Sequence, residues 1–187
     1  YTEYTYDQRG RITAFAEISQ NAQPTADDIK AHQIRYTYNE NGNLSKVSYP
    51  TTKDGIQSLS YIYDENGWLQ EIKGELHSKG QTTEKVLRSY SYDAYGKVKE
   101  IKDYRNRLKN GAQAVQKIYT YDSFDRVKEM TYTDLETGKV MESYRYSYDK
   151  NSNITEKTEV NNYPKEEKDK VNETKAYTYD ALGRLTK

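Results

Sequence analysis

A short tyrosine motif recurs seven times along the sequence, and this repetition constrains the fold more than any other feature. Each copy reads Tyr-x-Tyr followed by Asp, or by Asn in the second copy, and the second tyrosines of successive copies lie 25 to 32 residues apart. Internal repeats with such a period indicate one supersecondary unit that is stacked many times. The residues that define the seven copies are Tyr4, Tyr6 and Asp7; Tyr36, Tyr38 and Asn39; Tyr61, Tyr63 and Asp64; Tyr90, Tyr92 and Asp93; Tyr119, Tyr121 and Asp122; Tyr146, Tyr148 and Asp149; and Tyr177, Tyr179 and Asp180.

Each copy predicts a β-hairpin. Two tyrosines at a spacing of two lie on the same face of a strand. The Asp can accept hydrogen bonds from backbone N–H groups further on, and the Gly that follows three residues later in five copies tolerates positive φ. Asp125 and Ser152 replace this Gly in copies five and six, and both residues suit a turn. Two positions further on, an aliphatic residue opens the returning strand: Ile12, Leu44, Leu69, Val98, Val127, Ile154 or Leu185.

The returning strands do not alternate strictly. In pairs such as Leu69 and Ile72, or Val127 and Met130, the apolar residues are three positions apart rather than two. A β-bulge after the turn would bring both members of each pair to one face. The pattern allows this bulge without requiring it.

The connections between the hairpins are more variable. Short turns are predicted at residues 52–55, 78–80 and 136–139, and longer surface loops at 20–28 and 161–172. Residues 1–187 therefore predict a single all-β domain, an antiparallel meander of about 13 strands with roughly ten residues each. We expect an open, curved and twisted sheet or shell segment, with a large closed barrel as the alternative. Because the sequence begins with Tyr1, we expect a fragment or a processed mature chain.

Composition supports a folded chain with a thin core. The mean hydropathy is −1.17, but 21 tyrosines supply large side chains that can be partly buried. The formal net charge of zero argues against a nucleic-acid partner, which would require a basic surface. No apolar run approaches the roughly 20 residues of a membrane helix, and Arg88, Lys117 and Lys175 on the tyrosine side argue against a spanning barrel. We therefore expect no membrane span.

The sequence offers little for chemistry. It contains two histidines, His32 and His77, and no cysteine, and it shows no nucleophile–His–acid pattern. The stretch Asp149–Asn153 resembles the start of a calcium loop, but Ile154 stands where such a loop requires Gly. The recurring Asp is better explained as a turn residue, because an active site is usually single. We expect a non-enzymatic chain without cofactor or metal.

Three aromatic residues are candidates for contact with a ligand. Trp68 stands where other copies have Arg, Asn or Lys, and Tyr95 and Phe124 stand at turn apices. Exposed rings can stack on sugars or on partner proteins. The alternative is that these rings cover the end of the sheet.

The seventh copy, Tyr177-Thr178-Tyr179-Asp180-Ala181-Leu182-Gly183-Arg184-Leu185-Thr186, resembles the bacterial Rhs/YD repeat, and residues 4–12 are close to it. In that family the repeats form a spiral β-strand shell on secreted or surface proteins, including polymorphic toxins, insecticidal toxin complexes and animal teneurins. The periods here are longer than is usual in that family.

The resemblance implies a structural scaffold that is extracellular or at the cell surface, with or without a lipid anchor. The partners it implies are further repeats of the same chain, an encapsulated effector or a surface glycan. The alternative is a stand-alone extracellular binding module that uses its tyrosine-rich surface for carbohydrate or another surface ligand.

Overall fold

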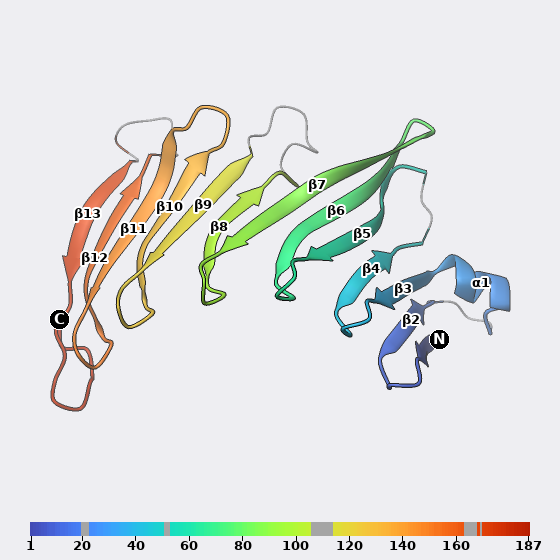
Figure 1. Cartoon of the computed structure of the whole chain (residues 1–187), viewed down its shortest axis with the longest axis horizontal. Helices are drawn as coiled ribbons and strands as arrows, with labels where there is room; N and C mark the ends of the chain where they lie inside the picture. The colour runs from blue at the N-terminus through green and yellow to red at the C-terminus, as the bar shows by residue number, and fades with distance from the viewer. Residues whose placement is uncertain (20–22, 51–52, 106–113, 163–167, 169) are drawn as a thin grey trace. The chain divides into compact units, whose positions relative to one another are not determined.

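The computed structural model describes residues 1–19, 23–50, 53–105, 114–162, 168 and 170–187 (Figure 1). Over these residues the chain forms 13 strands in one sheet, and the order of the strands follows the chain from β1 to β13. A single short helix interrupts the series. The elements are β1 (Thr2–Tyr6), β2 (Ile12–Glu17), α1 (Ala26–Ala31), β3 (Gln33–Tyr38), β4 (Leu44–Ser48), β5 (Gly55–Tyr63), β6 (Leu69–Ser78), β7 (Gln81–Tyr92), β8 (Val98–Asp103), β9 (Val115–Tyr121), β10 (Val127–Asp134), β11 (Val140–Tyr148), β12 (Ile154–Asn161) and β13 (Val171–Ala176).

This topology confirms the predicted all-β meander. The two ends of the strand order are β1 and β13, so the sheet is open and the closed-barrel alternative is wrong. Most strands are shorter than expected, with β1 and β4 having five residues each, and only β6 and β7 reach ten or more. The chain divides into two compact units, Tyr1–Ser89 and Tyr90–Lys187, with the boundary inside β7.

The seven turns share one geometry, shown here by the first. The N–H of Gly10 donates to the carbonyl of Asp7 at 3.0 Å, and the N–H of Asp7 donates to the carbonyl of Arg11 at 2.9 Å. One carboxylate oxygen of Asp7 also accepts from the N–H groups of Arg9 and Arg11. The residue three positions after the Asp or Asn has positive φ in every copy: Gly10, Gly42, Gly67, Gly96, Asp125, Ser152 and Gly183. Asp125 and Ser152 therefore adopt the backbone conformation of the Gly that they replace, as predicted.

A β-bulge follows the turn. Tyr63 lies opposite Leu69 and Tyr61 lies opposite Ile72, so one extra residue stands on the returning strand. The same shift occurs beside Tyr6, Tyr38, Tyr121 and Tyr148. The bulge that the apolar spacing allowed is thus present, and it places both aliphatic residues opposite tyrosines.

The two faces of the sheet differ in chemistry. The tyrosine face, which carries the Tyr-x-Tyr side chains, is half-buried at most of these positions, and on it Tyr4 packs on Phe15 with ring centroids 5.0 Å apart. On the opposite face of β11, Arg145 and Ser147 are exposed. Among the described residues, the buried apolar side chains are few and mostly small: Ala14, Ala16, Ile18, Val47, Leu87 and Ala114. The thin core expected from composition is therefore observed.

The second connections confirm two of the three predicted turns. Lys79 and Gly80 have positive φ between the paired residues Ser78 and Gln81. At 136–139 Gly138 has positive φ. The turn predicted at 52–55 lies partly outside the described residues, and so does much of the loop predicted at 161–172.

The prediction of a loop over all of residues 20–28 is wrong, because α1 begins at Ala26 within this range. The Thr25 hydroxyl accepts from the N–H of Asp28, and the Asp28 carboxylate accepts from the N–H of Thr25 at 2.9 Å. This reciprocal pair is a capping box, which satisfies backbone donors that a helix start leaves open. The Thr-x-x-Asp spacing is visible in the sequence and is typical of the start of a helix.

The left-handed turn residue gives a direct test. We expect Gly67→Val to lower the free energy of unfolding by about 1–2 kcal/mol, because a β-branched residue resists positive φ. A Cβ at Gly67 would meet its nearest neighbour, Asn43 Nδ2, only at 3.9 Å, so the cost is conformational rather than steric. The matched control Gly67→Asn should retain most of the stability in urea denaturation, since Asn tolerates this region. Equal midpoints for the Val and Asn variants would contradict the turn geometry.

Candidate functional site

The recurrent arrangement at the turn end of the strands is the best-defined group of interacting side chains in the molecule. It links each copy of the motif to the next through the second tyrosine. The Tyr148 hydroxyl donates to the carbonyl of Val127, the aliphatic residue that opens the returning strand of the preceding copy, at 2.7 Å. The equivalent bonds run from Tyr38 to Ile12, Tyr63 to Leu44, Tyr121 to Val98 and Tyr179 to Ile154, at 2.7 to 2.9 Å. We call these five bonds the tyrosine ladder.

A second contact joins the same copies. The residue after the left-handed position places its side chain over the second tyrosine of the next copy. Arg126 lies 4.5 Å from the centre of the Tyr148 ring, Arg11 lies 4.3 Å from that of Tyr38, and Lys97 Nζ lies 5.3 Å from that of Tyr121. Cations over aromatic faces at such distances contribute about 0.5–2 kcal/mol. One ring in each of these copies thus receives both a hydrogen-bond acceptor and a cation from the copy before it.

The cation of one turn also reaches the next turn. Arg126 Nη1 donates to the carbonyl of Asp149 at 2.9 Å and to the Ser152 hydroxyl at 3.1 Å. Lys97 Nζ pairs with the Asp125 carboxylate, and this hydrogen bond raises the pKa of Lys97. The two residues that replace the turn glycine are therefore the ones that accept from the preceding cation.

Burial of the ladder rings keeps their hydroxyls in the donor form. Desolvation raises the pKa of Tyr63, Tyr121 and Tyr148 above the ordinary value near 10. A neutral phenol is the form that can donate to a carbonyl. The hydrogen bonds that Tyr63, Tyr121 and Tyr148 donate are consequently kept throughout the neutral pH range.

The turn carboxylates are occupied by the turns themselves. One oxygen of Asp149 accepts from the N–H groups of Asn151 and Asn153, and the other accepts from Asn153 Nδ2 at 2.9 Å. The Asn153 side-chain bond and these backbone bonds lower the pKa of Asp149. Within the described part of the chain, no group of three or more His, Cys, Asp or Glu side chains is arranged to hold a metal ion. The calcium-like stretch has the same backbone hydrogen bonds as the other six turns, five of which are centred on Asp and one on Asn39.

The two histidines lie in polar, exposed surroundings. His32 Nδ1 is 2.8 Å from the carbonyl of Asp28 at the end of α1, and His77 Nδ1 is 3.0 Å from the Thr82 hydroxyl beside a hairpin turn. Both contacts are local to the turn or helix end on which each histidine stands. They assign no chemical step to either residue.

The structure separates the three candidate aromatics. The side chain of Tyr95 is 86% exposed and that of Phe124 is 77% exposed, and both occupy the second position after the Asp in neighbouring copies. Trp68 is half-buried and stands at the fourth position, where other copies carry the ring-covering cation. Its N–H closes the turn by donating to Asp64 at 2.9 Å. Trp68 is therefore less exposed than Tyr95 and Phe124, which present most of their surface to solvent.

Comparison with known proteins places the fold. No protein-family model matches the chain, and no curated protein does. A chain in the structure of the Photorhabdus luminescens Tc holotoxin pore is similar, with a TM-score of 0.66 and 22% identity over 94% of the present chain. A chain in the crystal structure of TcdB2-TccC3-TEV is similar with a TM-score of 0.66 and 21% identity over 97%. In each case the present chain spans 8% of the other chain.

These neighbours are toxin components, and at this identity the likeness concerns the fold. It agrees at that coarse level with the resemblance to the YD repeat of toxin complexes. Among the described residues, no helix is long and apolar enough to cross a membrane.

The tyrosine ladder was not predicted from the sequence. The sequence places the two tyrosines of each copy on one face of a strand, but it predicts no partner for the hydroxyl of the second tyrosine. The available signal was the fixed offset of six residues between each second tyrosine and the aliphatic residue after the turn.

The ladder predicts a difference between the two tyrosines of one copy. We expect Tyr148→Phe to lower the free energy of unfolding by about 1 kcal/mol, because the Val127 carbonyl loses a partly buried hydrogen-bond donor. Tyr146→Phe is the matched control, since no hydrogen bond involves the Tyr146 hydroxyl among the described residues. Chemical denaturation of both variants measures the difference, and an equal loss in the two would remove the ladder from the stabilising interactions.

The turn carboxylates predict a loss of stability in acid. The Arg126 guanidinium and the N–H groups of Arg126 and Phe124 lower the pKa of Asp122, and the N–H and guanidinium of Arg184 lower that of Asp180. Because the folded pKa lies below the unfolded value of about 3.9, this stability is complete above that value and is lost as pH falls through the folded pKa. Melting temperatures measured from pH 7 to pH 2.5 should therefore drop below about pH 4.

Replacing the charge at one turn supplies the control for this acid effect. Asp122→Asn should keep the turn, as Asn39 does in the second copy, where Asn39 Oδ1 accepts from the N–H of Asn43 at 2.9 Å. The variant should show a shallower acid dependence than the parent. Superimposable pH profiles would show that Asp122 does not contribute to it.

Proposed function

We propose that this chain is a non-catalytic structural scaffold, a stretch of stacked YD-type hairpins that builds a wall in a bacterial secreted or cell-surface protein. The observation that carries the proposal is the tyrosine ladder. In three copies, those of Tyr38, Tyr121 and Tyr148, the second tyrosine is completed by the preceding copy through both the carbonyl that it binds and the cation that covers it. Tyr63 and Tyr179 bind the preceding copy through the carbonyl. The motif thus consists of parts that fit together only when copies are adjacent.

The energetics of the sheet support a wall rather than a compact catalytic body. The Tyr-x-Tyr rings are mostly half-buried, and the fully buried side chains are small and scattered. A hairpin of this kind buries little surface alone, and its apolar residues are covered by the strands on either side. In such a repeat array, stability grows with the number of adjacent copies rather than with one central core.

The chemistry of the turns supports the same conclusion. The Asp carboxylates, which are the most regular charged groups in the chain, accept hydrogen bonds from their own turns. Hydrogen bonds within the turns lower the pKa values of Asp7, Asp93, Asp122, Asp149 and Asp180, so these carboxylates stay ionised rather than being poised to exchange protons near neutral pH. Their role is to accept the backbone N–H groups of the turns.

The proposed partners follow from the fold neighbours. Both neighbours are chains of toxin assemblies and are much longer than the present chain, which covers 8% of each. By analogy, the wall would adjoin further repeats of the same kind and would enclose an effector segment. Its location would be outside the cytoplasm, free or lipid-anchored.

The exposed rings of Tyr95 and Phe124 favour a second candidate function, a binding module. Their side chains project from adjacent turns of the second unit, and each lies beside a cation, with Lys97 Nζ 5.5 Å and the Arg126 guanidinium 5.1 Å from the ring centres. Aromatic rings flanked by cations suit a glycan or another polar surface polymer.

Inserting an extra repeat tests the scaffold. A second copy of residues 122–148 placed after Tyr148 keeps the Tyr–Asp junction of the motif at both ends. A wall of interchangeable copies should accept it, remain monodisperse, and show a larger urea m-value and a higher unfolding midpoint. An insert with the same residues in scrambled order is the control and should lower the midpoint. Aggregation or destabilisation by the native insert, equal to that by the scrambled insert, would reject the scaffold.

A further inference from the structure

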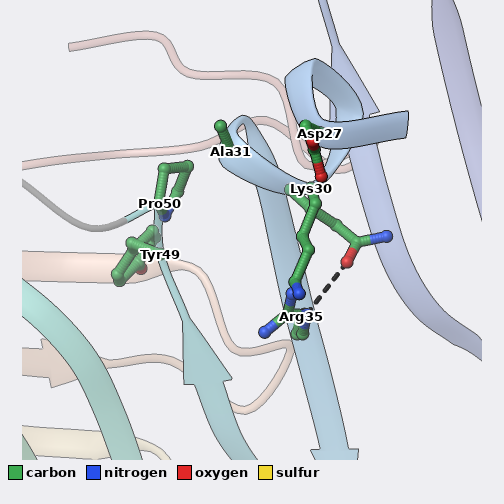
Figure 2. Close-up of a pocket in the computed structure, with 7 residues that line it drawn as sticks. Asp27, Lys30, Ala31, Arg35, Tyr49 and Pro50 are labelled. Carbon is green, nitrogen blue, oxygen red and sulfur yellow. Dashed lines mark hydrogen bonds between the residues drawn. The ribbon is translucent and has the colours of Figure 1, made fainter. Parts of the chain in front are cut away.

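The one helix of the described chain creates a cavity that the repeat pattern does not contain. In the first unit, the last turn of α1 faces β3 and the end of β4, and the space between them measures about 420 Å³. Its wall includes Asp27, Lys30, Gln33, Arg35, Tyr49 and Pro50 (Figure 2). This volume lies in the range of sites for small molecules, about 300–1,000 Å³.

Two cations line this cavity, and neither forms an ion pair with a carboxylate of the described residues. Figure 2 shows the Lys30 side chain extending from the helix toward Arg35 on the strand. Arg35 Nε donates to Gln33 Oε1 at 2.9 Å, which fixes the guanidinium and leaves its two terminal amino groups for other acceptors. Among the described residues, neither Lys30 nor Arg35 has a carboxylate within ion-pair distance.

Other arginines of the chain contrast with Arg35. Arg11, Arg126 and Arg184 each pair with the Asp of their own turn at 2.7 Å, and Arg145 pairs with Glu129 at 3.1 Å. The helix supplies two acidic residues next to the cavity, but Asp28 is engaged by the capping box, where it accepts from the N–H and the hydroxyl of Thr25. Asp27 alone remains on the wall, so the cavity carries two positive charges against one negative charge.

The remaining wall is formed by Ala31, Tyr49 and Pro50. The Tyr49 side chain is 36% exposed, and Pro50 follows it directly on the same side of the cavity. An aromatic ring next to a proline offers a plane on which another ring can lie. The cavity therefore combines a planar guanidinium fork, a second cation and a flat surface.

We propose that this cavity binds a small organic anion in which a carboxylate is attached to a ring. The terminal amino groups of Arg35 hold the carboxylate as a fork, the pairing that the planar guanidinium favours, and Lys30 adds the second positive charge. The ring of the ligand lies against Tyr49 and Pro50. An acidic sugar and an aromatic acid share this chemistry. The proposal does not depend on the scaffold function, because none of these residues belongs to the turns or to the ladder.

The probes for the test are D-glucuronate and benzoate, each compared with its neutral counterpart, D-glucose and benzyl alcohol. Binding is followed by the amide shifts of Gln33, Arg35 and Tyr49 in the ¹⁵N-labelled full chain. We expect at least one of the two acids to produce saturable shifts with a dissociation constant at or below the millimolar range, and the neutral compounds to produce none. Glucuronate alone would identify a sugar acid as the ligand class, and benzoate alone an aromatic acid.

Three variants test which side chains of the cavity wall contribute to binding. Arg35→Gln should weaken binding at least tenfold and Tyr49→Ala severalfold, whereas Asp27→Asn should strengthen it severalfold by removing the one negative charge of the wall. Arg9→Gln removes another exposed arginine of the same unit and should leave binding unchanged. All four residues are on the surface, and circular dichroism checks the fold of each variant. Absence of saturable shifts with both acids, or equal affinity of the parent and Arg35→Gln, would overturn the proposal.

Discussion

The hydrogen bonds that the turn Asp accepts from the backbone two and four residues ahead set the geometry on which the rest of the sheet depends. They hold the third residue in the left-handed region and start the returning strand one residue out of register. That shift is the bulge, and beside it lies the carbonyl that the next copy uses. Without the carboxylate or the Asn amide, the turn could open by one residue, and every aliphatic side chain that follows would change face. These local hydrogen bonds therefore determine which face of the returning strand is apolar.

Tyrosine suits this architecture because a single sheet cannot exclude water from either face. A Leu or Ile at the second position of the motif would stabilise the fold only in proportion to the apolar area that is buried. Much of such a side chain would remain exposed to water. The tyrosine ring is covered on one side by a cation and along its edge by the neighbouring strand, while its hydroxyl reaches a backbone acceptor. The side chain thus combines three weak interactions in a half-buried place. This explains how a chain with a mean hydropathy of −1.17 folds at all.

The sequence predicted well those features whose causes lie within a few residues. The turn at each Asp or Asn, the left-handed Asp125 and Ser152, and the strand count follow from short-range spacing, which also allowed the bulge without requiring it. The ladder was missed because its bonds join residues 19 to 26 positions apart, and their formation requires the bulge to exist first. The helix was missed because residues 20–28 were predicted to be a surface loop, although the spacing of Thr25 and Asp28 is that of a capping box. The cavity could not be foreseen, since it depends on where that helix comes to rest against β3 and β4.

The tyrosine ladder has a direction. In all five bonds the later copy donates and the earlier copy accepts, so the acceptor is always synthesised before the donor. A chain that emerges from its amino terminus therefore presents each new tyrosine to a carbonyl that is already in place. Assembly can advance one hairpin at a time in the order of translation, with the last finished hairpin serving as the template for the next. A sheet that forms in this way becomes ordered without contacts from distant segments of the chain. Its most recently formed hairpin is ordered at every stage.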